Sequence, residues 1–301
     1  MFTADAHCDT LYAISVSHKP AEEIAVTYER LEKGNVGLQT FALFAGTRDQ
    51  PGTPKSRVED MLRASKALKV PLIRSKLPQT PPESPAGVLS VEGGEALGGD
   101  INELFALARE GVRMIALCWN YENEIGFPGV LSSNEPLKGF GRELISEMDK
   151  LGILTDVSHL NDAGFFDAAA RTKLPLVASH SNLRSITNAS RNLTPEQVKV
   201  IVEKRGFIGV NFYSKFLASG RRATLDDVIR HIDGMCELGA CDNLGFGSDF
   251  DGIDEWPEGL DNPSRFPVLI DLLAKRGYTQ KQLEGFAGMN LWRVYKDANF
   301  G

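Results

Sequence analysis

The 301-residue sequence contains few cysteines and has no long apolar segment. Its four cysteines form no C-x-x-C pair, so we predict buried or unreactive thiols in a reducing compartment and no zinc–thiolate site. The longest apolar run, from Val36 to Ala45, is interrupted by Gln39 and is far shorter than the roughly 20 residues that cross a bilayer. We therefore predict no membrane span.

A basic excess and a phosphate-binding loop are also missing. Lysine and arginine number 33 against 40 aspartates and glutamates, so the net charge is −7 and a nucleic-acid partner is not expected. No G-x-G-x-x-G or P-loop pattern occurs, which disfavours an open doubly wound sheet that binds a dinucleotide. Cleavage of a secretory signal at the start of the chain would also remove His7, which is a candidate metal ligand, so we expect a cytoplasmic protein.

Short runs rich in valine, isoleucine, leucine and phenylalanine alternate with amphipathic segments, a pattern typical of parallel strands covered by helices. The predicted strands are 2–7, 37–44, 87–91, 113–119, 154–158, 176–179, 207–212 and 244–248. Eight such strands predict an α/β fold, a closed (β/α)8 TIM barrel, as one domain over residues 1–301. Thr194 and Thr279 are predicted to cap helices.

Residue types that bind metals follow these runs at their carboxyl ends, which converge on one mouth of a barrel. They are His7, Asp9, Glu92, His159, His180 and Asp249. His18 and His231 lack this context, so we predict that they are structural or exposed. Three imidazoles with three carboxylates exceed the ligands of one zinc, so we infer two ions sharing Glu92, about 3.5–4 Å apart.

The spacing of these residues suggests individual roles. His7 and Asp9 are two residues apart, so both side chains leave a strand on one face and can hold the same ion. His159 and His180 each follow an apolar run and a serine, which makes them a matched pair for a second ion. Asp249 would face the mouth as a catalytic base or a ligand, whereas Asp251 is typical of a turn.

Together these motifs resemble the membrane dipeptidase (renal dipeptidase-like) family, peptidase family M19, among the amidohydrolase-type metal-dependent hydrolases. The resemblance covers nearly the whole chain in order. It is carried by Asp5-Ala6-His7-Cys8-Asp9-Thr10, Val91-Glu92-Gly93-Gly94, Asp156-Val157-Ser158-His159, Ser179-His180-Ser181-Asn182, Ser190-Arg191-Asn192, Val210-Asn211-Phe212-Tyr213 and Gly247-Ser248-Asp249-Phe250-Asp251-Gly252.

The resemblance implies a zinc-dependent dipeptidase with two Zn²⁺, although other divalent metals are compatible with the ligands. His7 and Asp9 would bind one ion, His159 and His180 the other, and Glu92 would bridge both. A metal-bridging hydroxide would attack the amide of a dipeptide, including one with a D-residue at its C-terminal position. Asp249 would handle the proton and Arg191 would pair with the substrate carboxylate, a role that suits the planar guanidinium. A homodimer is compatible with the family.

Arg191 by itself is typical of a surface arginine near a helix start. Trp119 departs from the family, because renal enzymes carry there a histidine that helps to hold the substrate's carbonyl oxygen. Trp119 would narrow the pocket, donate through its indole N–H or pack at the barrel rim. Tyr213 and Asn211 end a predicted strand and either line the pocket or pack at its rim.

Two other functions are compatible with parts of this pattern. One is a metal-dependent amidohydrolase acting on another small amide or lactam, a deaminase substrate or a phosphoester, since barrels host many chemistries. The first strand has H-x-D in place of the H-x-H of many such enzymes, and no strand-end lysine is suited to carbamylation. The other is a non-catalytic metal-binding relative, which the presence of Asp249 and every candidate ligand disfavours.

Overall fold

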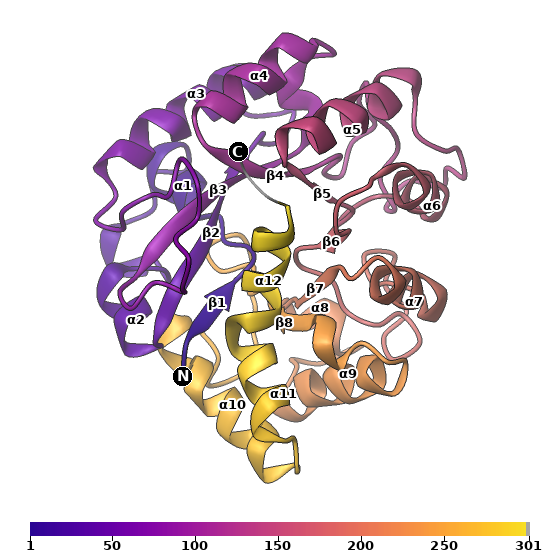
Figure 1. Cartoon of the computed structure of the whole chain (residues 1–301). Helices are drawn as coiled ribbons and strands as arrows, with labels where there is room; N and C mark the ends of the chain where they lie inside the picture. Colours follow the sequence, from indigo (N-terminus) through magenta and orange to yellow (C-terminus); the bar gives the residue numbers. More distant parts are fainter. Residues whose placement is uncertain (299–301) are drawn as a thin grey trace.

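The computed structural model describes residues 1–298, and its eight parallel strands form a closed barrel (Figure 1). The strands follow one another around the barrel in chain order, and β8 closes on β1. They are β1 (Thr3–Asp5), β2 (Val36–Phe44), β3 (Ala86–Glu92), β4 (Val112–Ala116), β5 (Leu154–Asp156), β6 (Val177–Ala178), β7 (Phe207–Val210) and β8 (Leu244–Phe246). The predicted (β/α)8 barrel is confirmed, while residues 299–301 of the predicted domain lie outside the described part.

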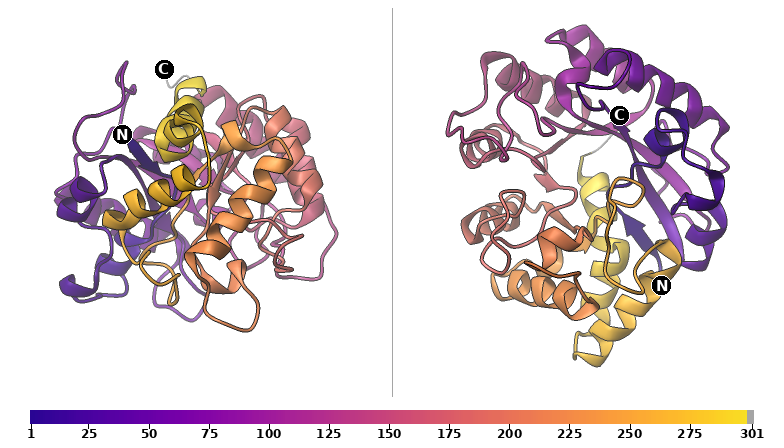
Figure 2. Two further views of the ribbon diagram at one scale, coloured as in Figure 1. Left: turned by 90° about the horizontal axis from the view of Figure 1, so that it is seen from below. Right: turned by 180° about the vertical axis from the view of Figure 1, so that it is seen from behind.

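Helices surround the barrel (Figures 1 and 2), and two of them begin at the predicted caps Thr194 and Thr279, each of which forms a capping box. The α-helices are α1 (Thr10–Ser15), α2 (Tyr28–Lys33), α3 (Pro54–Ala64), α4 (Ile101–Arg109), α5 (Gly139–Leu151), α6 (Asp162–Arg171), α7 (Pro195–Glu203), α8 (Ser214–Leu217), α9 (Leu225–Glu237), α10 (Phe266–Lys275), α11 (Gln280–Glu284) and α12 (Asn290–Asp297). Short 3-10 helices span Ala21–Glu23, Ser65–Ala67, Gly94–Leu97, Cys241–Asn243 and Pro263–Arg265, and a π-helical turn spans Gly285–Met289.

The last helix, α12, covers the amino-terminal opening of the barrel and lies across it in Figure 1. Its fully buried Tyr295 hydroxyl is 2.9 Å from Oγ1 of Thr40, on β2. Leu291 and Trp292 pack in one apolar cluster with strand residues such as Val88 and Met114. This packing fills the amino-terminal end of the barrel. The functional side chains lie at the opposite end, where the carboxyl ends of the strands form the mouth.

The prediction of free thiols is wrong for two of the cysteines. The chain reverses after α9 through Gly239 (φ 92°), which brings the Cα atoms of Cys236 and Cys241 to 4.5 Å, and these residues form a disulfide. Cys8 and Cys118 are buried free thiols, as predicted. Within residues 1–298 no helix is long and apolar enough to cross a membrane.

Candidate metal centre

The predicted strand-end residues meet at the barrel mouth, and each of them is almost fully removed from solvent or lines the cavity there. Glu92 is the last residue of β3. The others stand just beyond four further strands: His7 and Asp9 follow β1, His159 follows β5, His180 follows β6 and Asp249 follows β8. Because parallel strands end at the same edge, residues far apart in the sequence become neighbours here.

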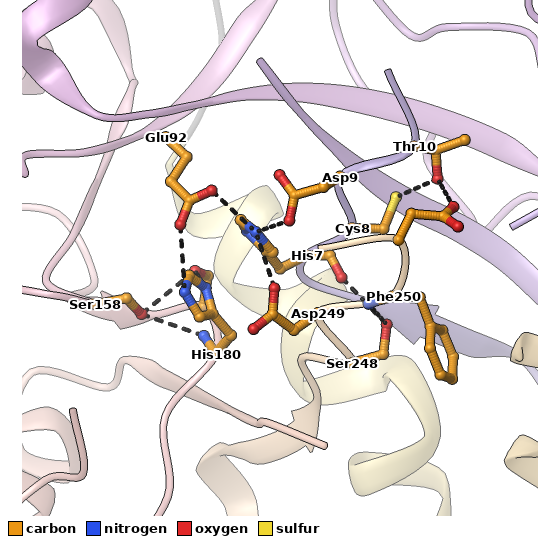
Figure 3. A network of polar contacts seen from close by, with 12 residues as sticks. His7, Cys8, Asp9, Thr10, Glu92, Ser158, His180, Ser248, Asp249 and Phe250 are labelled. Carbon is orange, nitrogen blue, oxygen red and sulfur yellow. Dashed lines mark hydrogen bonds and ion pairs between the residues drawn. The ribbon is translucent and has the colours of Figure 1, made fainter. Parts of the chain in front are cut away.

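The Glu92 carboxylate faces imidazoles with both of its oxygens, and Figure 3 shows its contact with His7. Its Oε2 is 3.5 Å from Nε2 of His7. Its Oε1 is 2.9 Å from Nε2 of His159 and 3.6 Å from Nε2 of His180. The Nε2 atoms of the latter two histidines are 3.0 Å apart. One carboxylate therefore presents one oxygen to His7 and the other to His159 and His180.

The His7 side of the centre contains two more carboxylates. Nε2 of His7 is 3.4 Å from Oδ2 of Asp9 and 3.7 Å from Oδ1 of Asp249. Among the described residues, neither Nε2 of His7 nor Oδ1 of Asp9 has a hydrogen-bond partner, although both atoms are buried. Buried polar atoms are rarely left without a partner, so this donor set fits a divalent cation.

Burial and neighbouring charges shift the pKa values of the residues in the centre in different directions. Burial lowers the pKa of His7, but Glu92 and Asp9 outweigh it and raise that pKa well above its ordinary value. Burial, with the charge of Glu92, raises the pKa of Asp9 to about 8. Burial, with the positive charge of Arg191, lowers the pKa of His159 to about 4, so its ring is neutral at pH 7 with a lone pair available.

Two site residues have left-handed backbone conformations that are uncommon outside glycine: φ is 75° at His159 and 62° at Asp249. Both turns are held by hydrogen bonds. The backbone N–H of Gly129 donates to the carbonyl of His159 (2.7 Å), and the N–H of Asp249 donates to the carbonyl of His7 (3.2 Å). The surrounding loops thus stabilise the turns that carry the two side chains.

A second layer of polar residues orients the histidines, and the sequence patterns did not predict this role. Asp156 accepts the Ser179 hydroxyl at 2.5 Å, and the Ser179 oxygen lies 2.8 Å from Nδ1 of His180. Because the hydroxyl proton points to Asp156, Ser179 accepts from the imidazole Nδ1–H, which leaves Nε2 of His180 as an acceptor facing Glu92. Oδ1 of Asn120, 3.0 Å from Nδ1 of His159, acts on that ring in the same way.

Asp249 is oriented by a residue from the neighbouring strand end. Nδ2 of Asn211 donates to Oδ2 of Asp249 at 2.9 Å, so Asn211 is more than a rim residue. Asp251, predicted as a turn residue, accepts hydrogen bonds from the backbone N–H groups of Ala25 and Val26. Asp251 therefore ties a distant segment to the mouth.

His231, predicted to be structural or exposed, is fully buried away from the metal centre. Its Nδ1 accepts from the N–H of Leu183, and its Nε2 is 3.1 Å from the carbonyl of Leu217. His231 therefore holds together the segments around those two leucines. His18 lies exposed, which also agrees with the prediction.

A cavity of about 670 Å³ opens above the centre. The predicted residues among its walls are Asp9, Glu92, Trp119, His159, Arg191, Tyr213 and Asp249. Arg191 is only 7% exposed, which contradicts its interpretation as a surface arginine. Its Nη2 is 3.5 Å from the carbonyl of His180, and its guanidinium lies 5.7 Å from the ring of Phe216. The cavity thus combines a buried cation, a candidate metal centre and aromatic walls.

A closed barrel with a histidine and carboxylate cluster at its mouth defines the class of (β/α)8-barrel metallohydrolases. The family model for membrane dipeptidase (peptidase family M19) matches residues 1–300. The chain belongs to this family of metallo-dipeptidases.

Two curated proteins are similar to this chain in sequence. An uncharacterized protein from the pqqA 5′ region of Klebsiella pneumoniae is 37% identical over 222 residues, which cover 70% of this chain and 82% of the relative. An uncharacterized dipeptidase of Schizosaccharomyces pombe is 34% identical over 217 residues, which cover 69% of this chain. The match spans 52% of the length of the yeast protein.

Two solved structures share the fold over nearly the full length. A metallopeptidase of Rhodobacter sphaeroides, liganded with a phosphinate mimic of the dipeptide L-Ala-D-Ala, has a TM-score of 0.89 and 24% identity, with 99% of each chain covered. Dipeptidase AC, an M19 metallopeptidase, has a TM-score of 0.87 and 26% identity, with 100% of this chain and 99% of that chain covered. Both superpose on the barrel from one end to the other.

Proposed function

We propose that this protein is a zinc-dependent dipeptidase whose two Zn²⁺ ions share Glu92. The observation that carries the proposal is the position of the Glu92 carboxylate, with Oε2 facing His7 and Oε1 facing His159 and His180. A dipeptide as substrate is supported by the family and by the L-Ala-D-Ala mimic bound to the Rhodobacter relative. We include dipeptides with a D-residue at the C-terminal position.

The ligands divide into two groups. His7 and Asp9 would hold one ion, and their partnerless buried atoms support this assignment. His159 and His180 would hold the other, because Asn120 and Ser179 leave their Nε2 atoms as acceptors. When bound, divalent ions lower the pKa of a water molecule and polarise a carbonyl oxygen.

Asp249 is the group that we propose takes the proton released from water and returns it to the leaving amine. Its carboxylate lies beside Nε2 of His7, and Asn211 fixes its orientation. Burial raises the pKa of Asp249, which makes the carboxylate a better proton acceptor than an exposed one. The proton acceptor would thus stand at the edge of the centre.

Arg191 would bind the substrate carboxylate through two parallel hydrogen bonds. Burial lowers the pKa of Arg191 to about 10, so the guanidinium still carries its charge at neutral pH. A fixed carboxylate places only the adjacent amide over the centre, which favours dipeptides over longer peptides.

The test is elemental analysis of protein purified without chelators, for wild type and Glu92→Gln, followed by a screen of L,L and L,D dipeptides. We expect about two zinc ions per chain, fewer in the variant, and turnover of dipeptides. Glu95→Gln, at a partly buried glutamate that accepts from Asn123, is the matched control and should retain both ions. One ion or none after reconstitution contradicts the shared site. Turnover of lactams without dipeptides would favour the amidohydrolase alternative.

A further inference from the structure

Three aromatic side chains form a continuous wall on one side of the cavity. Tyr12 and Phe44 have ring centroids 5.0 Å apart, and so do Phe44 and Trp119. All three line the cavity, and the Trp119 ring lies 6.2 Å from the ring of the candidate ligand His159. We call Tyr12, Phe44 and Trp119 the aromatic wall.

The order of the strands puts the Phe44 part of the aromatic wall across the barrel from β6, and Trp119, just beyond β4, extends the wall toward His159. The eight strands are arranged in chain order around a closed ring, so β2 stands across the barrel from β6, as Figure 1 shows. Phe44 is the last residue of β2. The Arg191 guanidinium lies against the carbonyl of His180, just beyond β6. Glu92, on β3, reaches between them to the histidines.

We propose that the aromatic wall binds the side chain of the substrate's N-terminal residue, so that the preferred substrates are dipeptides with a large apolar or aromatic N-terminal side chain. The inference rests on the proposed function. If the carboxylate is bound by Arg191 and the amide lies over the metal centre, only the N-terminal residue of the dipeptide extends toward β2 and the aromatic wall. The wall determines specificity in addition to the chemistry assigned above.

The aromatic wall is suited to this task because it is preformed. Phe44 contacts the rings of both Tyr12 and Trp119, and Trp119 also contacts the ring of Tyr121, with centroids 5.3 Å apart. A rigid wall loses little conformational entropy when a ligand binds. Trp119 supplies a broad apolar face, so an aromatic ring gains both burial and ring contacts there.

The opposite wall of the cavity offers a different surface. Next to Arg191 the cavity is lined by the small residues Ala189 and Ser190, with Phe216 beneath the guanidinium. The C-terminal residue would lie here, where its carboxylate is held. We therefore expect selectivity for size and hydrophobicity at the N-terminal position to exceed that at the C-terminal position.

The experiment compares two dipeptide series on metal-loaded protein, X-Ala and Ala-X, with X as Gly, Leu, Phe, Lys or Asp. We expect kcat/KM for Phe-Ala to exceed that for Gly-Ala by about tenfold or more, the range that a hydrophobic pocket provides. Trp119→Ala should reduce this ratio to below about threefold, and Trp119→Phe should retain most of it. Trp256→Ala, which removes a tryptophan outside the cavity lining, is the matched control and should keep the wild-type ratio.

Three outcomes would overturn the proposal: equal kcat/KM across the X-Ala series, a stronger preference in the Ala-X series, or an unchanged Phe-to-Gly ratio in Trp119→Ala. Failure to hydrolyse any dipeptide would instead contradict the proposed function. In that case, calorimetric titration with phosphinate mimics of Phe-Ala and Gly-Ala tests the wall separately. About tenfold tighter binding of the Phe mimic supports the wall, and equal binding overturns it.

Discussion

Ser179 and His180 are consecutive in the chain, and their side chains are hydrogen-bonded to each other, with Oγ 2.8 Å from Nδ1. Ser179 also donates to the buried carboxylate of Asp156. The carboxylate thereby determines, through Ser179, which imidazole nitrogen of His180 carries the proton. Across the barrel a second buried serine donates to a carboxylate, where Ser248 contacts Asp5 at 2.6 Å beside Asp249.

Removing the Ser179 hydroxyl should weaken metal binding at one side of the centre. In Ser179→Ala, Nδ1 of His180 loses its acceptor, so the ring no longer favours the tautomer with a free Nε2. We expect affinity for one of the two ions to fall by about 10- to 100-fold, as is usual for such supporting residues. Calorimetric titration of the metal-free protein with Zn²⁺ measures the change.

Ser248→Ala provides the matched control, because its hydroxyl also donates to a buried carboxylate but contacts no imidazole nitrogen. Imidazole ¹⁵N shifts of the metal-free proteins report the tautomer independently of metal. The proposed role of the serine would be contradicted if Ser179→Ala bound zinc as tightly as the wild-type protein. It would also be contradicted if His180 in the wild-type protein carried its proton on Nε2.

Arg191→Ala should raise KM for dipeptides more than it lowers kcat. Loss of a buried, bidentate partner for the substrate carboxylate should cost about 2–3 kcal/mol of binding free energy, or about 30- to 150-fold in KM. For a dipeptide amide, which has no carboxylate, KM should differ far less between wild type and variant. Arg142→Ala, at an exposed arginine paired with Asp167, should behave like wild type. Equal losses on the acid and the amide would argue against a carboxylate contact.

Gly252→Ala should displace the Asp9 carboxylate. A Cβ at this position would lie 2.0 Å from Oδ2 of Asp9 and 3.0 Å from Oδ1 of Asp249. The Asp9 side chain can rotate away while the backbone stays in place, so we expect reduced zinc content with little change in thermal stability. Gly139→Ala, where nothing lies within 4 Å of the added Cβ, is the control. Full zinc content in Gly252→Ala would mean that Asp9 is not required.

Stability in acid should depend on Asp227 at the start of α9. Arg221 forms two hydrogen bonds with its carboxylate (2.6 and 2.8 Å), and this pairing, aided by Thr224, lowers the pKa of Asp227 against the opposing effect of burial. A lowered pKa stabilises the fold at pH values above the unfolded value of about 3.9, and this stabilisation is lost as the pH falls through the folded value.

Asp227→Asn should therefore lower the free energy of unfolding by about 1–2 kcal/mol at pH 7 and by less near pH 3. Urea denaturation of metal-free wild type and variant at the two pH values gives the difference, and Asp226→Asn at the neighbouring position is the control. A wild-type-to-variant difference that does not shrink in acid would contradict the assignment.

The sequence alone determined the barrel and the set of residues at its mouth. Alternating strand and helix patterns predict a parallel sheet, and a closed ring of parallel strands must bring its carboxyl ends together. For that reason the strand-end positions of His7, Glu92, His159 and His180 were sufficient to predict that these residues meet. Asn211 could be placed at a strand end, but not in contact with Asp249.

Tertiary structure decided which atoms face one another. The contacts of Asp156 with Ser179, of Asn120 with His159 and of Tyr12 with Phe44 join different strand ends, so they depend on strand register and loop path, which no local pattern encodes. The burial of Arg191 has the same reason. The disulfide between Cys236 and Cys241 depends instead on a local turn through Gly239, which the absence of a C-x-x-C pair did not exclude. Periodicity tells which face of a strand a side chain occupies, whereas only the folded chain supplies its partner.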